Sequence, residues 1–242
     1  NSIIVENLSK NYSENKAVNN INFKIGENEI VGLLGPNGCG KTTTIAMLLG
    51  LLKPTSGQIL INGISIENNR IELLHKMNFI SPYIELPKKL TVKENLVVYS
   101  KLYSVKNFKN RIDYLSDTLR LHDFINKKTG ELSSGQKNRV SFAKSLINNP
   151  SILLLDEPTA SLDPETADFV RTFLENYKKE KKISILLASH NMNEVERLCS
   201  SILMMKEGKI IDKGTPKELI KKHGRKNLEE VFLKLTRTKN EH

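Results

Sequence analysis

The segment that most constrains the fold of this chain is residues 35–42, which read Gly-Pro-Asn-Gly-Cys-Gly-Lys-Thr. They match the pattern G-x-x-x-x-G-K-[ST], whose glycines leave backbone N–H groups free to surround phosphate at the N-terminus of a helix. Residues 29–34 before the segment indicate a short buried strand, and residues 43–49 after it indicate a helix. A strand, a loop and a helix in that order predict a phosphate-binding loop, and therefore a nucleoside triphosphate ligand.

Two side chains of this loop have predicted roles. Lys41 would reach the β- and γ-phosphates, and the Thr42 hydroxyl would coordinate Mg²⁺, which prefers hard oxygen ligands. The predicted nucleotide-binding residues of the segment are Gly35, Pro36, Asn37, Gly38, Cys39, Gly40, Lys41, Thr42 and Thr43.

Cys39 supports a further hypothesis. A thiol at a helix N-terminus can have a lowered pKa and raised reactivity, so maleimide would inactivate the protein and ATP would protect it. The alternative is an inert side chain that points away from the phosphates. The only other cysteine, Cys199, is most simply a core residue, and two cysteines of this kind do not form a disulfide framework.

Composition excludes several classes of protein. With 38% hydrophobic and 26% charged residues, the 242-residue chain is ordinary globular protein, without an apolar run near the ~18 residues that span a bilayer and without a signal peptide. We therefore expect a soluble, cytoplasmic protein. Of the net charge of +10, residues 206–242 carry +5 (11 Lys and Arg, 6 Asp and Glu), interleaved with apolar residues. That interleaving favours a solvated helical face over a membrane- or partner-binding patch, and nothing predicts nucleic-acid binding.

Alternating strand and helix patterns predict an α/β fold with a mainly parallel sheet. Residues 3–5, 21–25 and 58–61 indicate strands near the N-terminus, and residues 30–34, 151–155 and 183–188 indicate buried strands. Helical spacing marks residues 92 to about 125, a helix from the segment 132–136 through Ile147, and residues 164–177.

Two carboxylates and a histidine follow buried strands, at the edge where open α/β sheets bind ligands. Asp156 suits the magnesium shell, and Glu157 suits orienting or deprotonating the attacking water. The alternative is that both cap a turn before Pro158. His190 is placed to contact a γ-phosphate and sense its loss, although a lone histidine is more often structural.

The motifs GPNGCGKTT, LSSGQ, LLLDEP, SLD and SH occur in the order and spacing of ATP-binding-cassette (ABC) transporter ATPases, which this chain resembles over nearly its whole length. The resemblance implies a P-loop NTPase fold with a mainly parallel core sheet, an N-terminal antiparallel β subdomain and an inserted helical subdomain. Residues 1–242 would form one domain, with about 1–80 and 150–242 as the nucleotide-binding core and about 81–149 as the helical subdomain.

The resemblance also implies ATP and Mg²⁺ as cofactors and a head-to-tail homodimer. Ser133, Ser134, Gly135 and Gln136 of one subunit would close over the γ-phosphate bound by the other, and Asp163 would lie in the loop that links the two sites. Tyr12 falls where the family stacks an aromatic ring on adenine; its alternative is a plain edge-strand tyrosine.

One family element is absent. The family carries a glutamine after the strand that enters the helical subdomain, but this chain reads Ser-Pro-Tyr-Ile-Glu over residues 81–85 and has glutamines only at Gln58 and Gln136. Pro82 aligns with the missing residue, and Tyr83 and Glu85 are nearby polar substitutes. The departure predicts slower or differently coupled ATP hydrolysis.

The resemblance implies the ATPase subunit of a transporter, held at the inner face of the cell membrane by a separate integral-membrane permease. Residues 228–235 are similar to the ending of drug- and polysaccharide-exporter ATPases, which favours export, and residues 79–103 are the expected permease contact. Two alternatives stay open: a soluble regulator of translation or DNA metabolism, and a scaffold gated by nucleotide that hardly turns ATP over.

Overall fold

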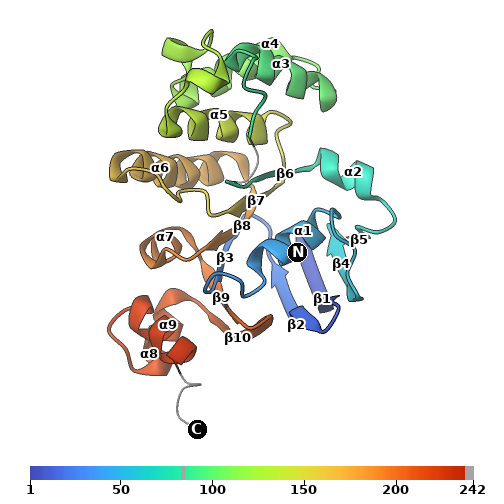
Figure 1. Cartoon of the computed structure of the whole chain (residues 1–242), viewed down its shortest axis with the longest axis vertical. Coiled ribbons are helices and arrows are strands. Elements are labelled where there is room, and N and C mark those ends of the chain that lie inside the picture. Colours follow the sequence, from blue (N-terminus) through green and yellow to red (C-terminus); the bar gives the residue numbers. More distant parts are fainter. Residues whose placement is uncertain (83–84, 238–242) are drawn as a thin grey trace.

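A computed structural model describes residues 1–82 and 85–237, with two sheets at its centre. The larger sheet has the strand order β10-β9-β3-β8-β7-β6 (Figure 1). Its strands are β3 (Ile30–Leu34), β6 (Met77–Ile80), β7 (Ile152–Asp156), β8 (Ser184–Ser189), β9 (Ser201–Lys206) and β10 (Lys209–Gly214). All neighbouring pairs are parallel except β9 with β10, so the predicted α/β fold with a mainly parallel sheet is confirmed.

The smaller sheet is antiparallel, with the order β2-β1-β4-β5. It contains β1 (Ile3–Tyr12), β2 (Asn15–Ile25), β4 (Ser56–Ile61) and β5 (Ile64–Ser65). β1 and β2 are longer than their short apolar patterns predict, because bulges interrupt their register and break the alternation that marks a strand in sequence. The predicted N-terminal antiparallel sheet is confirmed.

Alternate residues of β7 face two cores, as the period of a strand requires. Leu153 and Leu155 pack with α6 (Pro164–Lys181) and α7 (Met192–Leu198), whereas Ile152 and Leu154 pack with α1 (Lys41–Leu48) and the smaller sheet. The larger sheet is thus covered on both faces, which explains why β3, β7 and β8 read as continuous apolar runs.

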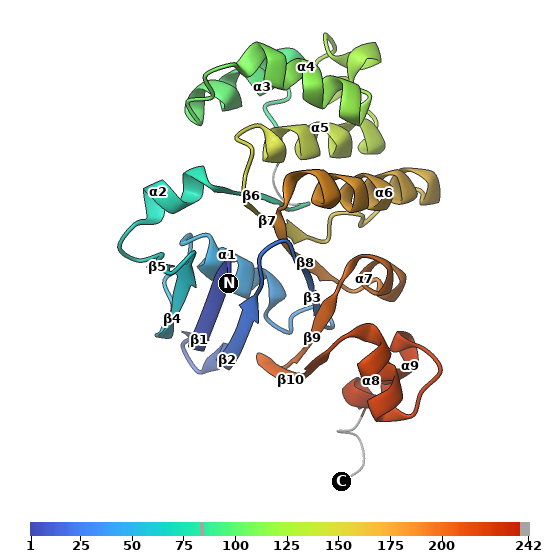
Figure 2. The ribbon, with the colours of Figure 1, turned by 180° about the vertical axis from the view of Figure 1, so that it is seen from behind.

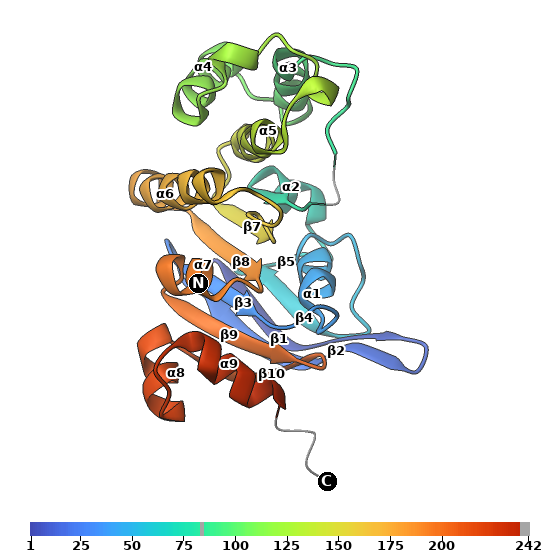
Figure 3. The ribbon, with the colours of Figure 1, turned by 60° about the vertical axis from the view of Figure 1, so that its left-hand side comes forward.

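Three helices gather at one end of the molecule, above α6 in Figures 1, 2 and 3. They are α3 (Val92–Leu102), α4 (Phe108–Leu119) and α5 (Ser134–Leu146), followed along the chain by β7. Capping boxes fix two of their starts, with Thr91 and Glu94 at α3 and Ser133 and Gln136 at α5. The patterns did not indicate α2 (Arg70–His75), which buries only Leu73.

The C-terminal helices α8 (Pro216–His223) and α9 (Leu228–Arg237) lie at the opposite end of the molecule (Figure 2). They pack on the larger sheet through Leu219, Leu228 and Val231. Within the described ranges, no helix is both long and apolar enough to cross a bilayer.

Candidate nucleotide-binding site

Three adjacent strands bring the predicted motifs to one edge of the larger sheet. β8 lies between β3 and β7, with Leu34 paired to Ser189 and Ala188 paired to Asp156. The phosphate-loop segment 35–42 follows β3, and His190 follows β8. Because the strands are parallel, residues that are more than a hundred positions apart in sequence meet at their carboxyl ends.

The backbone of segment 35–42 is shaped for a close ligand. Gly38 and Gly40 have φ angles of 77° and 109°, in the region that favours glycine. A side-chain carbon at Gly40 would overlap the Ala17 carbonyl oxygen, and one at Gly35 would overlap that of Met205. Gly40 precedes α1 and no side chain caps this helix, so its first N–H groups are free to bind an anion.

Lys41 is 6% exposed and closes the loop on itself. Its ammonium donates hydrogen bonds to the carbonyl oxygens of Gly35 at 2.7 Å and Pro36 at 3.2 Å. The same Nζ lies 3.7 Å from Oε1 of Glu157. The structure thus brings together the cation of the first motif and a carboxylate of the second.

Thr42 and Asp156 are hydrogen-bonded partners. The Thr42 hydroxyl donates to Asp156 Oδ2 at 2.8 Å, and Asp156 is 1% exposed. Burial raises the pKa of Asp156, an effect that the Thr42 hydrogen bond partly offsets. Its other oxygen, Oδ1, is buried without a hydrogen-bond partner among the described residues. An unpaired buried carboxylate oxygen beside a hydroxyl fits a hard cation such as Mg²⁺.

Protein side chains alone do not complete a metal site here. Among residues 1–82 and 85–237, no three His, Cys, Asp or Glu residues gather into a metal-binding cluster. Magnesium usually binds one or two protein ligands together with substrate phosphates and waters. The pair Thr42 and Asp156 matches that pattern.

Glu157 is held against His190. Nδ1 of His190 lies 2.8 Å from Oε2 of Glu157, whose side chain is 17% exposed. Glu157 has a φ of 50°, which is uncommon for a residue with a side chain, and its N–H donates to the Ala188 carbonyl at 2.8 Å. The structure therefore places Glu157 between Lys41 and His190, with a carboxylate available to orient a water.

The segment 133–136 lies at the start of α5, away from the phosphate loop. Ser133 accepts from the N–H of Gln136 at 3.2 Å, and Gln136 accepts from the N–H of Ser133 at 3.0 Å. Both Ser133 and Ser134 are exposed, and Gly135 approaches Thr166 of α6. No hydrogen bond or ion pair described here joins these residues to residues 35–43 of the same chain.

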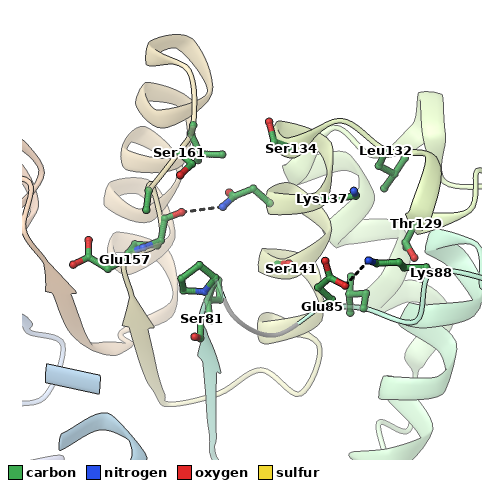
Figure 4. A pocket seen from close by; sticks show the side chains of 17 residues that line it. Ser81, Glu85, Lys88, Thr129, Leu132, Ser134, Lys137, Ser141, Glu157 and Ser161 are labelled. Carbon is green, nitrogen blue, oxygen red and sulfur yellow. Dashed lines mark hydrogen bonds and ion pairs between the residues drawn. The ribbon is translucent and has the colours of Figure 1, made fainter. Parts of the chain in front are cut away.

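A cavity of about 330 Å³ lies between α5 and the segments that follow β6 and β7. Figure 4 shows Ser134, Lys137 and Ser141 of α5 on one wall, with Glu157 opposite and its carboxylate pointing away from the cavity. Asn138 crosses the gap and donates to the Pro158 carbonyl at 2.8 Å. Sequence reasoning missed this link, because an asparagine within a helix carries no signal of its partner.

Pro82 lines the same cavity at the position of the absent glutamine. Glu85 pairs with Lys88 at 2.6 Å, and that hydrogen bond lowers the pKa of Glu85. Glu85, one of the two polar residues predicted to replace the glutamine, is therefore paired with Lys88 in this structure. Tyr83, the other substitute, lies outside the described residues.

Tyr12 and Asp163 have local surroundings that the motifs did not indicate. Tyr12 ends β1 opposite Asn15, is 49% exposed and lies under the Lys10 ammonium. Asp163 caps α6 by accepting from the N–H of Thr166 at 2.9 Å. Hydrogen bonding to the Thr166 side chain, and then to this N–H, lowers the pKa of Asp163.

The reactive-thiol hypothesis for Cys39 is wrong. Cys39 is 3% exposed, and burial raises the pKa of its thiol even though nearby Lys41 acts to lower it. Backbone N–H groups at the helix start also act to lower this pKa, but the effect of burial is larger. Cys199 is buried in the core, as predicted.

A family model described as "ABC transporter" matches residues 18–160. The bacitracin transport ATP-binding protein of Bacillus licheniformis is 39% identical over 92% of this chain and 72% of its own length. A Nod factor export ATP-binding protein I of Burkholderia orbicola is 36% identical over 88% and 71%. A dimeric ATP-binding cassette, solved in a post-hydrolysis state with ADP and Pi, shares 27% identity and a TM-score of 0.80 over 88% of this chain and 98% of that one.

Proposed function

We propose, since this chain belongs to the ABC transporter family, that it drives an exporter by binding and hydrolysing ATP at the sheet edge formed by β3, β8 and β7. ATP binding and hydrolysis are properties of the family. Export is supported by relatives whose names state bacitracin transport and Nod factor export. The observation that carries the proposal is the position of Glu157, paired with His190 and 3.7 Å from Lys41.

A small set of residues binds ATP and hydrolyses it. Lys41 exchanges its carbonyl partners for the β- and γ-phosphates, and the free N–H groups of α1 bind the remaining phosphate oxygens. Glu157 orients the attacking water and accepts its proton, while His190 holds Glu157 and faces the γ-phosphate. Thr42 and Asp156 would hold Mg²⁺, which would offset negative charge on the phosphates when bound.

A second copy of the chain completes the site. The start of α5 is exposed or half-buried at Ser133, Ser134, Gly135 and Gln136. In the described part of the chain, these residues form no hydrogen bond or ion pair with the phosphate loop of their own chain. Supplied by a partner, they bind the γ-phosphate from the opposite side, with Asp163 in the linking loop and Tyr12 against adenine. The dimeric cassette with ADP and Pi supports this arrangement.

A separate permease anchors the dimer at the cytoplasmic face of the membrane, and residues 79–103 contact it.

Pro82 favours a second candidate function, a slow scaffold gated by nucleotide. Proline supplies no side-chain amide to the cavity, so a contact between nucleotide and α3–α5 is missing at this point. Such a scaffold would dimerise on ATP without appreciable turnover.

One experiment separates the two functions. ATP hydrolysis with magnesium is measured for the wild-type chain and for Glu157→Gln, and both are sized with and without ATP; Glu67→Gln, at an exposed position, is the control. Turnover in the wild type with an ATP-trapped dimer of Glu157→Gln supports the motor. A wild-type dimer without turnover supports the scaffold. Absence of both turnover and ATP-dependent dimerisation would overturn both.

A further inference from the structure

The carboxyl group of Glu194 lies buried directly behind the site. Glu194 belongs to α7 and is 0% exposed. Its Oε1 accepts from the Thr159 hydroxyl at 2.8 Å, and its Oε2 accepts from the Ser189 hydroxyl at 2.8 Å. Thr159 is two residues beyond Glu157, and Ser189 immediately precedes His190. One buried side chain thus joins the two loops that carry these residues.

The buried carboxyl group of Glu194 is explained by its two hydrogen bonds. Its neighbours in α7, Val195 and Leu198, are buried in the core, and an apolar residue would be easier to bury than an acid. Burial raises the pKa of Glu194, and the two hydroxyl hydrogen bonds oppose that rise. The hydrogen bonds therefore satisfy both oxygens while fixing Thr159 and Ser189 at a set separation.

The loop that Glu194 holds is strained. Glu157 and Ser161 have φ angles of 50° and 61°, a conformation that persists only where the surroundings impose it. In front of the loop, His190 contacts Glu157 at 2.8 Å. Behind it, the bridge from Thr159 through Glu194 reaches Ser189, whose oxygen also accepts from the N–H of Asn191 at 3.0 Å.

We propose that Glu194 is a positioning residue, which keeps Glu157 and His190 in contact by tying Thr159 to Ser189. This inference rests on the proposed roles of Glu157 and His190 in hydrolysis. Glu194 acts through two hydroxyl groups and is itself 0% exposed, so its loss changes the rate of the chemical step rather than the binding of ATP.

The kinetic test compares the purified full chain with Glu194→Leu, Glu194→Gln, Thr159→Val and the double variant Glu194→Leu/Thr159→Val. The control is Glu196→Gln, which repeats the change of Glu194→Gln at an exposed position of the same helix. We expect Glu194→Leu to lower kcat between about 10-fold and about 100-fold with KM for ATP unchanged, because small misplacements of reacting groups cost this much. We expect Thr159→Val to lower kcat as well. The double variant should be no slower than Glu194→Leu, because both single changes break the same bridge from Thr159 to Ser189.

A second readout needs no turnover. The imidazole nitrogen NMR shift of His190 in the nucleotide-free chain reports its contact with Glu157. We expect this shift to move in Glu194→Leu and to stay in Glu196→Gln. If Glu194→Leu does not fold, Glu194→Gln and Thr159→Val take its place, and each loses part of the bridge.

Two results would overturn the inference. One is an unchanged His190 shift in a folded variant that lacks the bridge. The other is a fall in kcat that tracks the melting temperature and adds fully in the double variant, since that marks a purely structural role. A wild-type chain without turnover whose His190 shift still responds to Glu194→Leu would count against the proposed ATPase and leave the positioning role supported.

Discussion

The ammonium of Lys41 donates a hydrogen bond of 2.7 Å to the carbonyl oxygen of Gly35, so the phosphate loop satisfies its own cation before any nucleotide binds. We expect Lys41→Met to lower ATP affinity by about 10-fold or more, because a charge-assisted contact with phosphate contributes roughly 1.5–3 kcal/mol. The melting temperature should also fall, since methionine fills the space but leaves the Gly35 and Pro36 carbonyl oxygens without the ammonium. Titration with a fluorescent ATP analogue measures the affinity. Lys53→Met, at an exposed position, is the control, and equal affinities for both variants would contradict the expectation.

Gly40 and Gly38 form a matched pair for the backbone of the loop. Both have positive φ angles, but only at Gly40 would a side-chain carbon overlap neighbouring atoms, including the Ala17 carbonyl oxygen. Gly38→Ala should lower the free energy of unfolding by about 1–2 kcal/mol from backbone strain alone. Gly40→Ala should lower it further, because the clash adds to the strain. Denaturant unfolding of both variants measures the difference, and equal losses would refute it.

Cys39 should resist alkylation at neutral pH. Burial raises the pKa of its thiol, so a smaller fraction is thiolate at pH 7 than in a free cysteine, and that fraction grows only as the pH rises. The Cys199→Ser variant leaves Cys39 as the only thiol. Its maleimide labelling should be slow when folded, faster at alkaline pH, and fast after unfolding in guanidinium. Rapid labelling of the folded chain at pH 7 would be inconsistent with a buried thiol.

Pro82→Gln should raise ATP turnover. The change restores a side-chain amide at the edge of the cavity beside α5. We expect a higher kcat with little change in KM for ATP, because the amide would act after the nucleotide is bound. Pro87→Gln, an exposed proline in the same connection, is the control. An unchanged kcat in Pro82→Gln would show that the departure at this position does not limit hydrolysis.

The elements that the sequence predicts best are those whose environment is uniform. β3, β7 and β8 are buried on both faces, so their apolar runs are unambiguous. The helix predicted to open in the segment 132–136 begins at Ser134 in the structure, where Ser133 caps it. The pattern for α2 is weak because one buried leucine leaves no period to detect. Bulges likewise hid the true lengths of β1 and β2.

The sequence likewise predicted some of the site residues and missed others. Lys41, Thr42, Asp156, Glu157 and His190 stand at strand or helix ends, where topology alone places them, and the structure brings them together. Glu194 gave no signal, because a glutamate in an amphipathic helix is normally expected at the surface. Burial of the Cys39 sulfur beside Gly35 gave no signal either, because it depends on tertiary packing that no local pattern encodes.

Because β3, β8 and β7 pair without a register shift, the lengths of these strands set where the site residues at their carboxyl ends lie. Ile30 to Leu34 pair one-for-one with Ile185 to Ser189, and Ile152 to Asp156 with Ser184 to Ala188. Deleting one residue from β7 would draw its carboxylates back by about 3.3 Å and turn them to the opposite face of the sheet. Exchanges among valine, isoleucine and leucine leave that spacing intact. Natural variants of this chain should therefore accumulate substitutions inside these strands and confine insertions and deletions to the loops at the other edge of the sheet.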